Sequence, residues 1–63
     1  MTLGDLLFTI NPYDKVCIQY GDGTVGYTDV CSDVRTEMKK HDLLNAEVDC
    51  IRAFDSTVIL LLK

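Results

Sequence analysis

One stretch of the chain has glycine spacing that could bind a nucleotide phosphate: residues 21–26, GDGTVG. In the G-x-G-x-x-G fingerprint the glycines open a helix, and the phosphate lies at the N-terminus of that helix. Here the second glycine is followed by TVGYT, which is β-branched, aromatic and glycine-rich and has no helical apolar stripe. Asp-Gly is instead a strong hairpin signal, because glycine adopts positive φ easily. The sequence therefore predicts a hairpin turn here.

Three cysteines and one histidine give the ligand count of a zinc site: Cys17, Cys31, Cys50 and His41. Structural zinc sites usually bring cysteines in close pairs such as C-x2-C, and the chain has no such pair. A Cys–His nucleophile needs an activated thiol in a cleft, for which 63 residues leave little room. We therefore expect cysteines that act as small apolar side chains, no metal, no cofactor and no enzymatic activity.

The carboxylates are the next candidates. Ten acidic and six basic residues give a formal net charge of −4, which disfavours a non-specific grip on nucleic acid. Most aspartates fall at predicted caps and turns, where they form local hydrogen bonds. Three acidic residues fall within predicted strands instead, where they could guard a sheet edge or face a basic partner protein. These candidate partner-binding residues are Asp29, Glu47 and Asp49. The alternative surface is a basic cluster predicted to project from a helix: Arg35, Lys39 and Lys40.

Two short helices are predicted. Residues 3–10 carry apolar residues at i, i+3, i+4 and i+7, with Thr2 as the cap and Asn11-Pro12 as the end. Asp5 lies three residues after Thr2, close to a capping box. The second helix covers residues 33–41 with Ser32 as its cap, and Val34, Met38 and His41 share one side.

Four strands account for most of the remaining residues. Residues 15–20 and 24–30 alternate around the GDG turn, with Gly26 at a predicted bulge. Residues 47–54 alternate imperfectly, which predicts a bulge near Cys50. The last strand, TVILLL, is apolar on both faces, so we expect it to lie centrally and to be covered on both sides.

Together these elements predict one α+β domain over residues 1–63, in the order α-β-β-α-β-β. Two tight turns predict antiparallel hairpins, and hence a four-stranded antiparallel sheet or partial barrel with both helices on one face. The other face is half apolar, so we expect it to be curled into the barrel or buried against a second copy. TVILLL is far shorter than the roughly 20 residues of a membrane-spanning helix. The N-terminus lacks an export signal, and with an odd number of cysteines this predicts a cytoplasmic protein.

The segments MTLGDLLFTI, KVCIQYGDG and VDCIRAFDSTVILLL resemble short uncharacterised cytosolic proteins encoded by phages and conjugative elements of Gram-positive bacteria. Some small acidic proteins of such elements are anti-CRISPR inhibitors, which place carboxylates where an effector binds nucleic-acid phosphates. The resemblance implies a non-enzymatic inhibitor of a host nucleic-acid-handling protein. The basic cluster departs from an all-acidic mimic. The alternative is a homo-oligomeric structural module that dimerises through the apolar C-terminal strand.

Overall fold

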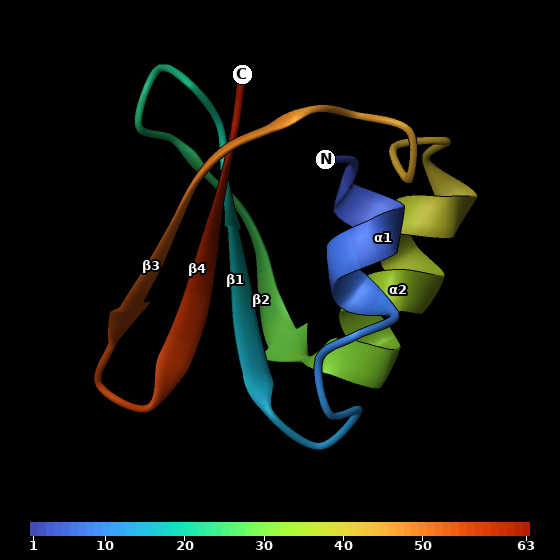
Figure 1. Ribbon diagram of the computed structural model, residues 1–63, viewed down its shortest axis with the longest axis vertical. Coiled ribbons are helices and arrows are strands. Elements are labelled where there is room, and N and C mark those ends of the chain that lie inside the picture. Colours follow the sequence, from blue (N-terminus) through green and yellow to red (C-terminus); the bar gives the residue numbers. More distant parts are fainter.

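A computed structural model describes residues 1–63 and places two helices against one face of a four-stranded sheet (Figure 1). The element order is α-β-β-α-β-β, as the sequence predicts. The helices are α1 (Leu3–Leu7) and α2 (Cys31–Lys40), and neither is long and apolar enough to cross a membrane. The strands are β1 (Lys15–Gln19), β2 (Val25–Val30), β3 (Val48–Phe54) and β4 (Thr57–Leu62).

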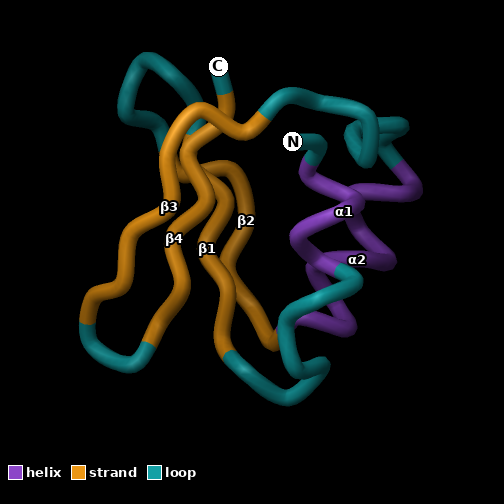
Figure 2. The backbone as a smooth tube through the Cα atoms, viewed as in Figure 1, coloured by secondary structure: helices purple, strands orange, loops and turns teal.

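The sheet has the strand order β2-β1-β4-β3, in which the strands lie side by side (Figure 2). Both predicted hairpins are antiparallel, but β1 and β4 pair in parallel, so the sheet is mixed and open. The two strands that bury the most apolar side chains, β1 and β4, take the two central positions. Tight turns determine each hairpin locally, whereas the pairing of one hairpin with the other depends on which strands must be buried. Strand β4 consequently pairs with β1 on one side and with β3 on the other.

Two bulges interrupt the ladders where the sequence predicts them. The β1–β2 register shifts between Ile18 and Gln19, which leaves Gly26 as the extra residue. The β3–β4 register shifts between Val48 and Cys50, which leaves Asp49 as the extra residue. The second bulge reconciles the imperfect alternation of this segment, because it lets Val48 and Cys50 point to opposite faces.

Helix α1 is capped as predicted but is shorter. The Asp5 amide donates to Thr2 Oγ1 at 3.3 Å, and the Thr2 amide donates to Asp5 Oδ2 at 3.4 Å, which completes a capping box. The helix ends at Leu7 instead of continuing through Ile10. The Leu6 carbonyl accepts from the Thr9 hydroxyl at 2.7 Å as well as from the Thr9 and Ile10 amides at 3.0 and 3.1 Å. The residues after Leu7 therefore form a turn that leads into Asn11-Pro12.

Helix α2 begins at Cys31, one residue before the predicted Ser32 cap, and that prediction is wrong. The first amides of α2 donate to carbonyls of the loop between α1 and β1: Cys31 to Asp14 at 2.7 Å and Ser32 to Pro12 at 3.1 Å. Backbone from elsewhere in the chain thus replaces a side-chain cap. His41 is exposed and bonds Glu37 at 3.0 Å, so it does not share the buried side of Val34 and Met38.

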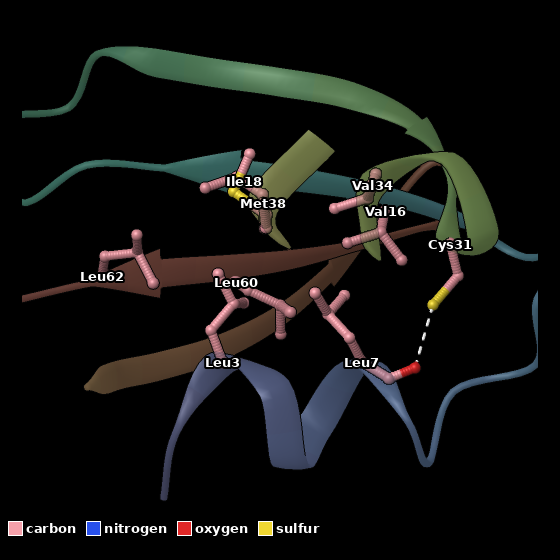
Figure 3. Close-up of a cluster of buried hydrophobic side chains, with 9 residues drawn as sticks. All are labelled: Leu3, Leu7, Val16, Ile18, Cys31, Val34, Met38, Leu60 and Leu62. Atoms are coloured by element: carbon pink, nitrogen blue, oxygen red, sulfur yellow. Dashed lines mark hydrogen bonds between the residues drawn. The ribbon is translucent and has the colours of Figure 1, made fainter. Parts of the chain in front are cut away.

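The core lies between the helices and the sheet (Figure 3). It consists of nine buried residues: Leu3, Leu7, Val16, Ile18, Cys31, Val34, Met38, Leu60 and Leu62. Strand β4 contributes Leu60 and Leu62 from one face only. The expectation that β4 is covered on both sides is wrong, because both helices lie on the same side of the sheet (Figure 1).

Candidate functional site

The glycine-rich stretch forms a hairpin turn, as predicted. Gly23 has a φ of 91°, and its amide donates to the Tyr20 carbonyl at 2.8 Å. Asp22 Oδ1 accepts from the Thr24 amide at 3.0 Å and from the Thr24 hydroxyl. These bonds from Thr24 lower the pKa of Asp22 below its usual value, because they stabilise the ionised carboxylate. Strand β2 follows directly, so no helix N-terminus is present to hold a phosphate.

The three candidate carboxylates are not brought together. Asp29 lies in β2, whereas Glu47 and Asp49 lie immediately before and within β3, at the opposite edge of the sheet. Asp29 Oδ1 accepts from the Val30 amide at 2.8 Å. Glu47 pairs with the N-terminal ammonium of Met1 at 3.3 Å. Asp49 is exposed at the bulge. A single acidic surface made of all three residues is therefore absent.

The basic cluster is also divided. Arg35 does not project outward as expected but folds onto the end of α1: its Nε donates to the Leu7 carbonyl at 3.0 Å. Its Nη2 donates to the Ile10 carbonyl at 3.5 Å, and the guanidinium lies 4.9 Å from the centre of the Phe8 ring. Only Lys39 and Lys40 are exposed. The periodicity of α2 could not reveal this contact, because it depends on where α1 ends.

The cysteines lie in two different environments. Cys31 is fully buried, and its thiol donates to the Leu7 carbonyl at 3.2 Å. Cys17 and Cys50 are half-buried on the sheet face opposite the helices. No three potential metal ligands converge in the structure, and no pocket indents its surface.

The sheet face away from the helices, called the open face below, is covered by no other element of the chain (Figure 1). The pairing registers place twelve residues on it in three rows that cross the strands in the order β2, β1, β4, β3. The first row is Val30, Lys15, Thr57 and Phe54. The second is Thr28, Cys17, Ile59 and Arg52, and the third is Val25, Gln19, Leu61 and Cys50.

The charges of the open face differ from those of the whole chain. Seven of its residues are apolar: Val25, Val30, Cys17, Cys50, Phe54, Ile59 and Leu61. Three are neutral and polar, and the two charged residues, Lys15 and Arg52, are both basic. None of the ten acidic residues of the chain lies in these rows. The sequence predicts a half-apolar face that carries Lys15, but it does not place Arg52 there, because the row partners follow from the parallel pairing of β1 with β4.

The open face is small. Six residues of β4 extend about 20 Å and four strands about 19 Å, which gives roughly 380 Å² of planar area. A standard protein–protein interface buries about 800 Å² on each partner. The centre of the face is shielded by neighbouring side chains, whereas Val25 and Phe54 at the outer strands are 57% and 74% exposed. The open face is therefore suited to a narrow partner segment.

Comparison of the chain with protein-family models, curated proteins and solved structures gives no match. Function is therefore inferred from the residues and from their arrangement in the fold.

Proposed function

We propose that the protein is a non-enzymatic protein-binding module and that the open face is its binding surface. The observation that carries this proposal is an uncovered four-stranded surface with Cys17, Ile59 and Leu61 at its centre. Contiguous apolar surface of this kind on a small domain usually marks an interaction site. A partner that covers it would remove from water the apolar side chains that the two helices leave uncovered.

The other candidate surfaces support binding less well. Glu47 and Asp49 form a short acidic edge, but Asp29 is three strands away. Arg35 is engaged with α1, which leaves two lysines in the last turn of α2, where positive charge complements the helix dipole. Each of these groups has a local structural explanation, whereas the apolar residues of the open face have none.

The resemblance to anti-CRISPR inhibitors adds a target class to this proposal, namely a host nucleic-acid-handling protein. The paired rows of the open face carry Lys15 and Arg52, and none of their twelve residues is acidic. An inhibitor that binds through this face would therefore contact its target outside a basic nucleic-acid groove, and would act by blocking an assembly surface or a movement of the target.

Site-specific photo-cross-linking in cells that naturally carry the gene tests the proposal. A photoreactive side chain replaces Thr28, which is exposed on the open face, or Thr36, which is exposed on α2. We expect a discrete adduct with another protein from position 28 and none from position 36. Adducts from position 36 alone would contradict the proposed surface. Adducts only between two copies of the chain would support the homo-oligomeric alternative instead.

A further inference from the structure

Building on the proposed function, we infer that the open face binds one amphipathic helix of a partner protein, and that this helix carries carboxylates along one flank. The bound helix would form a third layer, opposite the layer of α1 and α2. Three features of the open face favour such a helix: its size, the direction of its apolar stripe and the placement of its two charges. Other occupants also fit the face less well.

The size of the face matches one helix. A helix is about 10 Å wide with its side chains and rises 1.5 Å per residue, so about 13 residues would cross a face of roughly 20 Å. A layer of helix on each side is a stable way to cover a sheet that contains a parallel pair. The existing layer covers one side only (Figure 1).

The apolar centre forms a diagonal stripe across the middle of the sheet. It runs from Cys17 on β1 through Ile59 and Leu61 on β4 to Cys50 on β3. Between its ends it moves two strands across and one row along. The spacings of a sheet make this diagonal about 12 Å long. Residues at i, i+3, i+4 and i+7 of an amphipathic helix form an apolar stripe of similar length.

The two basic residues lie along a parallel diagonal. Arg52 on β3 lies two strands across and one row along from Lys15 on β1. The two basic residues are therefore also separated by about 12 Å. Both lie on the same side of the stripe, while Gln19, Thr28 and Val25 lie on the other. Carboxylates seven or eight residues apart on a helix are separated by about 11–12 Å. One flank of a bound helix would thus face both cations.

Other occupants fit the face less well. Two open faces packed together would bring two copies of Lys15 and Arg52 into one interface, and none of the paired row residues supplies a carboxylate to them. An extended segment would pair with the free edge of β3 or β2, and the face would stay uncovered. A basic helix would be attracted by the net charge of −4 but repelled at the face itself.

A displayed library of sixteen-residue helical peptides tests the inference. Every member has the same leucine stripe, and the flanking positions vary among Glu, Gln and Lys. The library is selected on the purified protein, and winning peptides are measured by calorimetry and mapped by NMR. We expect Glu to be enriched on one flank, shifts at Cys17 and Ile59, and binding about fivefold tighter than for the Lys-flanked analogue, as two exposed ion pairs allow.

Charge reversal on the protein supplies the matched control. Lys15→Glu with Arg52→Glu should reverse the preference, so that the Lys-flanked peptide binds more tightly. Lys39→Glu with Lys40→Glu makes the same change in net charge on α2 and should leave the preference unchanged. Both pairs are exposed, so both variants should fold.

Each other outcome overturns the helix inference. Binding at the open face without a flank preference, or with a preference for Lys, would remove the acidic helix but leave the proposed binding surface intact. Peptides that map to the edge of β3 would assign the site to strand pairing. A selection that yields no binder above background would also overturn the inference. The cross-linking experiment at Thr28 would still test the proposed function independently.

Discussion

Arg35 should be a stabilising residue and not a binding residue. Arg35→Ala removes the 3.0 Å bond to the Leu7 carbonyl, the 3.5 Å bond to Ile10 and the contact with the Phe8 ring. A hydrogen bond from a charged donor contributes about 1.5–3 kcal/mol, and an exposed cation–π contact about 0.5–1 kcal/mol. The Cys31 thiol still donates to the Leu7 carbonyl at 3.2 Å, which limits the loss. We expect a destabilisation of about 2 kcal/mol, or a Tm lowered by about 8–16 °C in a domain of this size.

Thermal unfolding followed by circular dichroism measures this effect. Lys39→Ala and Lys40→Ala are the controls, and each should change stability by less than about 0.5 kcal/mol because both side chains are exposed. Arg35→Lys should be intermediate, because lysine keeps the charge but not the planar donor group. The reasoning is refuted if Arg35→Ala melts within about 2 °C of the natural chain. Loss of partner binding in such a stable variant would assign Arg35 to the interface.

Three further predictions concern local structure. Thr2→Ala breaks the capping box and should cost about 1 kcal/mol in denaturant unfolding, whereas Thr2→Ser should restore most of it; equal stability of the two variants would deny the cap a role. Gly4→Ala should lower the Tm although alanine is favoured in helices by about 1 kcal/mol, because its Cβ would lie 3.0 Å from the Leu44 backbone oxygen; a raised Tm would contradict the close packing. The lowered pKa of Asp22 contributes stability that is present above its unfolded-state value of 3.8 and is lost as the pH falls through the folded-state pKa. Asp22→Asn should therefore be less stable than the natural chain at pH 7, with the difference closing on acidification, and a gap that persists at low pH would refute this explanation.

The local elements of the fold could be predicted from the sequence. The Thr2 cap, the turn at Gly23 and the two bulges are encoded by residues within a few positions of each other. The parallel pairing of β1 with β4 could not be predicted in this way. This pairing depends on which of the four strands occupy the buried centre of the sheet, and no short sequence pattern specifies that strand order.

The same distinction explains the candidate site. Asp29, Glu47 and Asp49 stood out because acidic residues in strands are unusual, but the strand order places them at opposite edges. The periodicity of α2 assigns Arg35 to an exposed basic surface, but its guanidinium instead donates to the Leu7 carbonyl at the end of α1. A half-apolar sheet face could be predicted from the sequence, but its rows of residues follow only from the register that aligns Cys17 with Ile59 and Ile59 with Arg52.

The native cysteines allow the most direct measurement of the central claim that the open face binds a partner. Cys17 and Cys50 lie at the two ends of its apolar stripe, whereas Cys31 is fully buried in the core. The thiols are alkylated in the purified protein and, separately, in the complex isolated from its native cells, and the rate at each cysteine is read by mass spectrometry. The account predicts that Cys17 and Cys50 react in the free protein and become protected in the complex, while Cys31 is slow in both. Equal rates at Cys17 and Cys50 in the free and bound protein would contradict it.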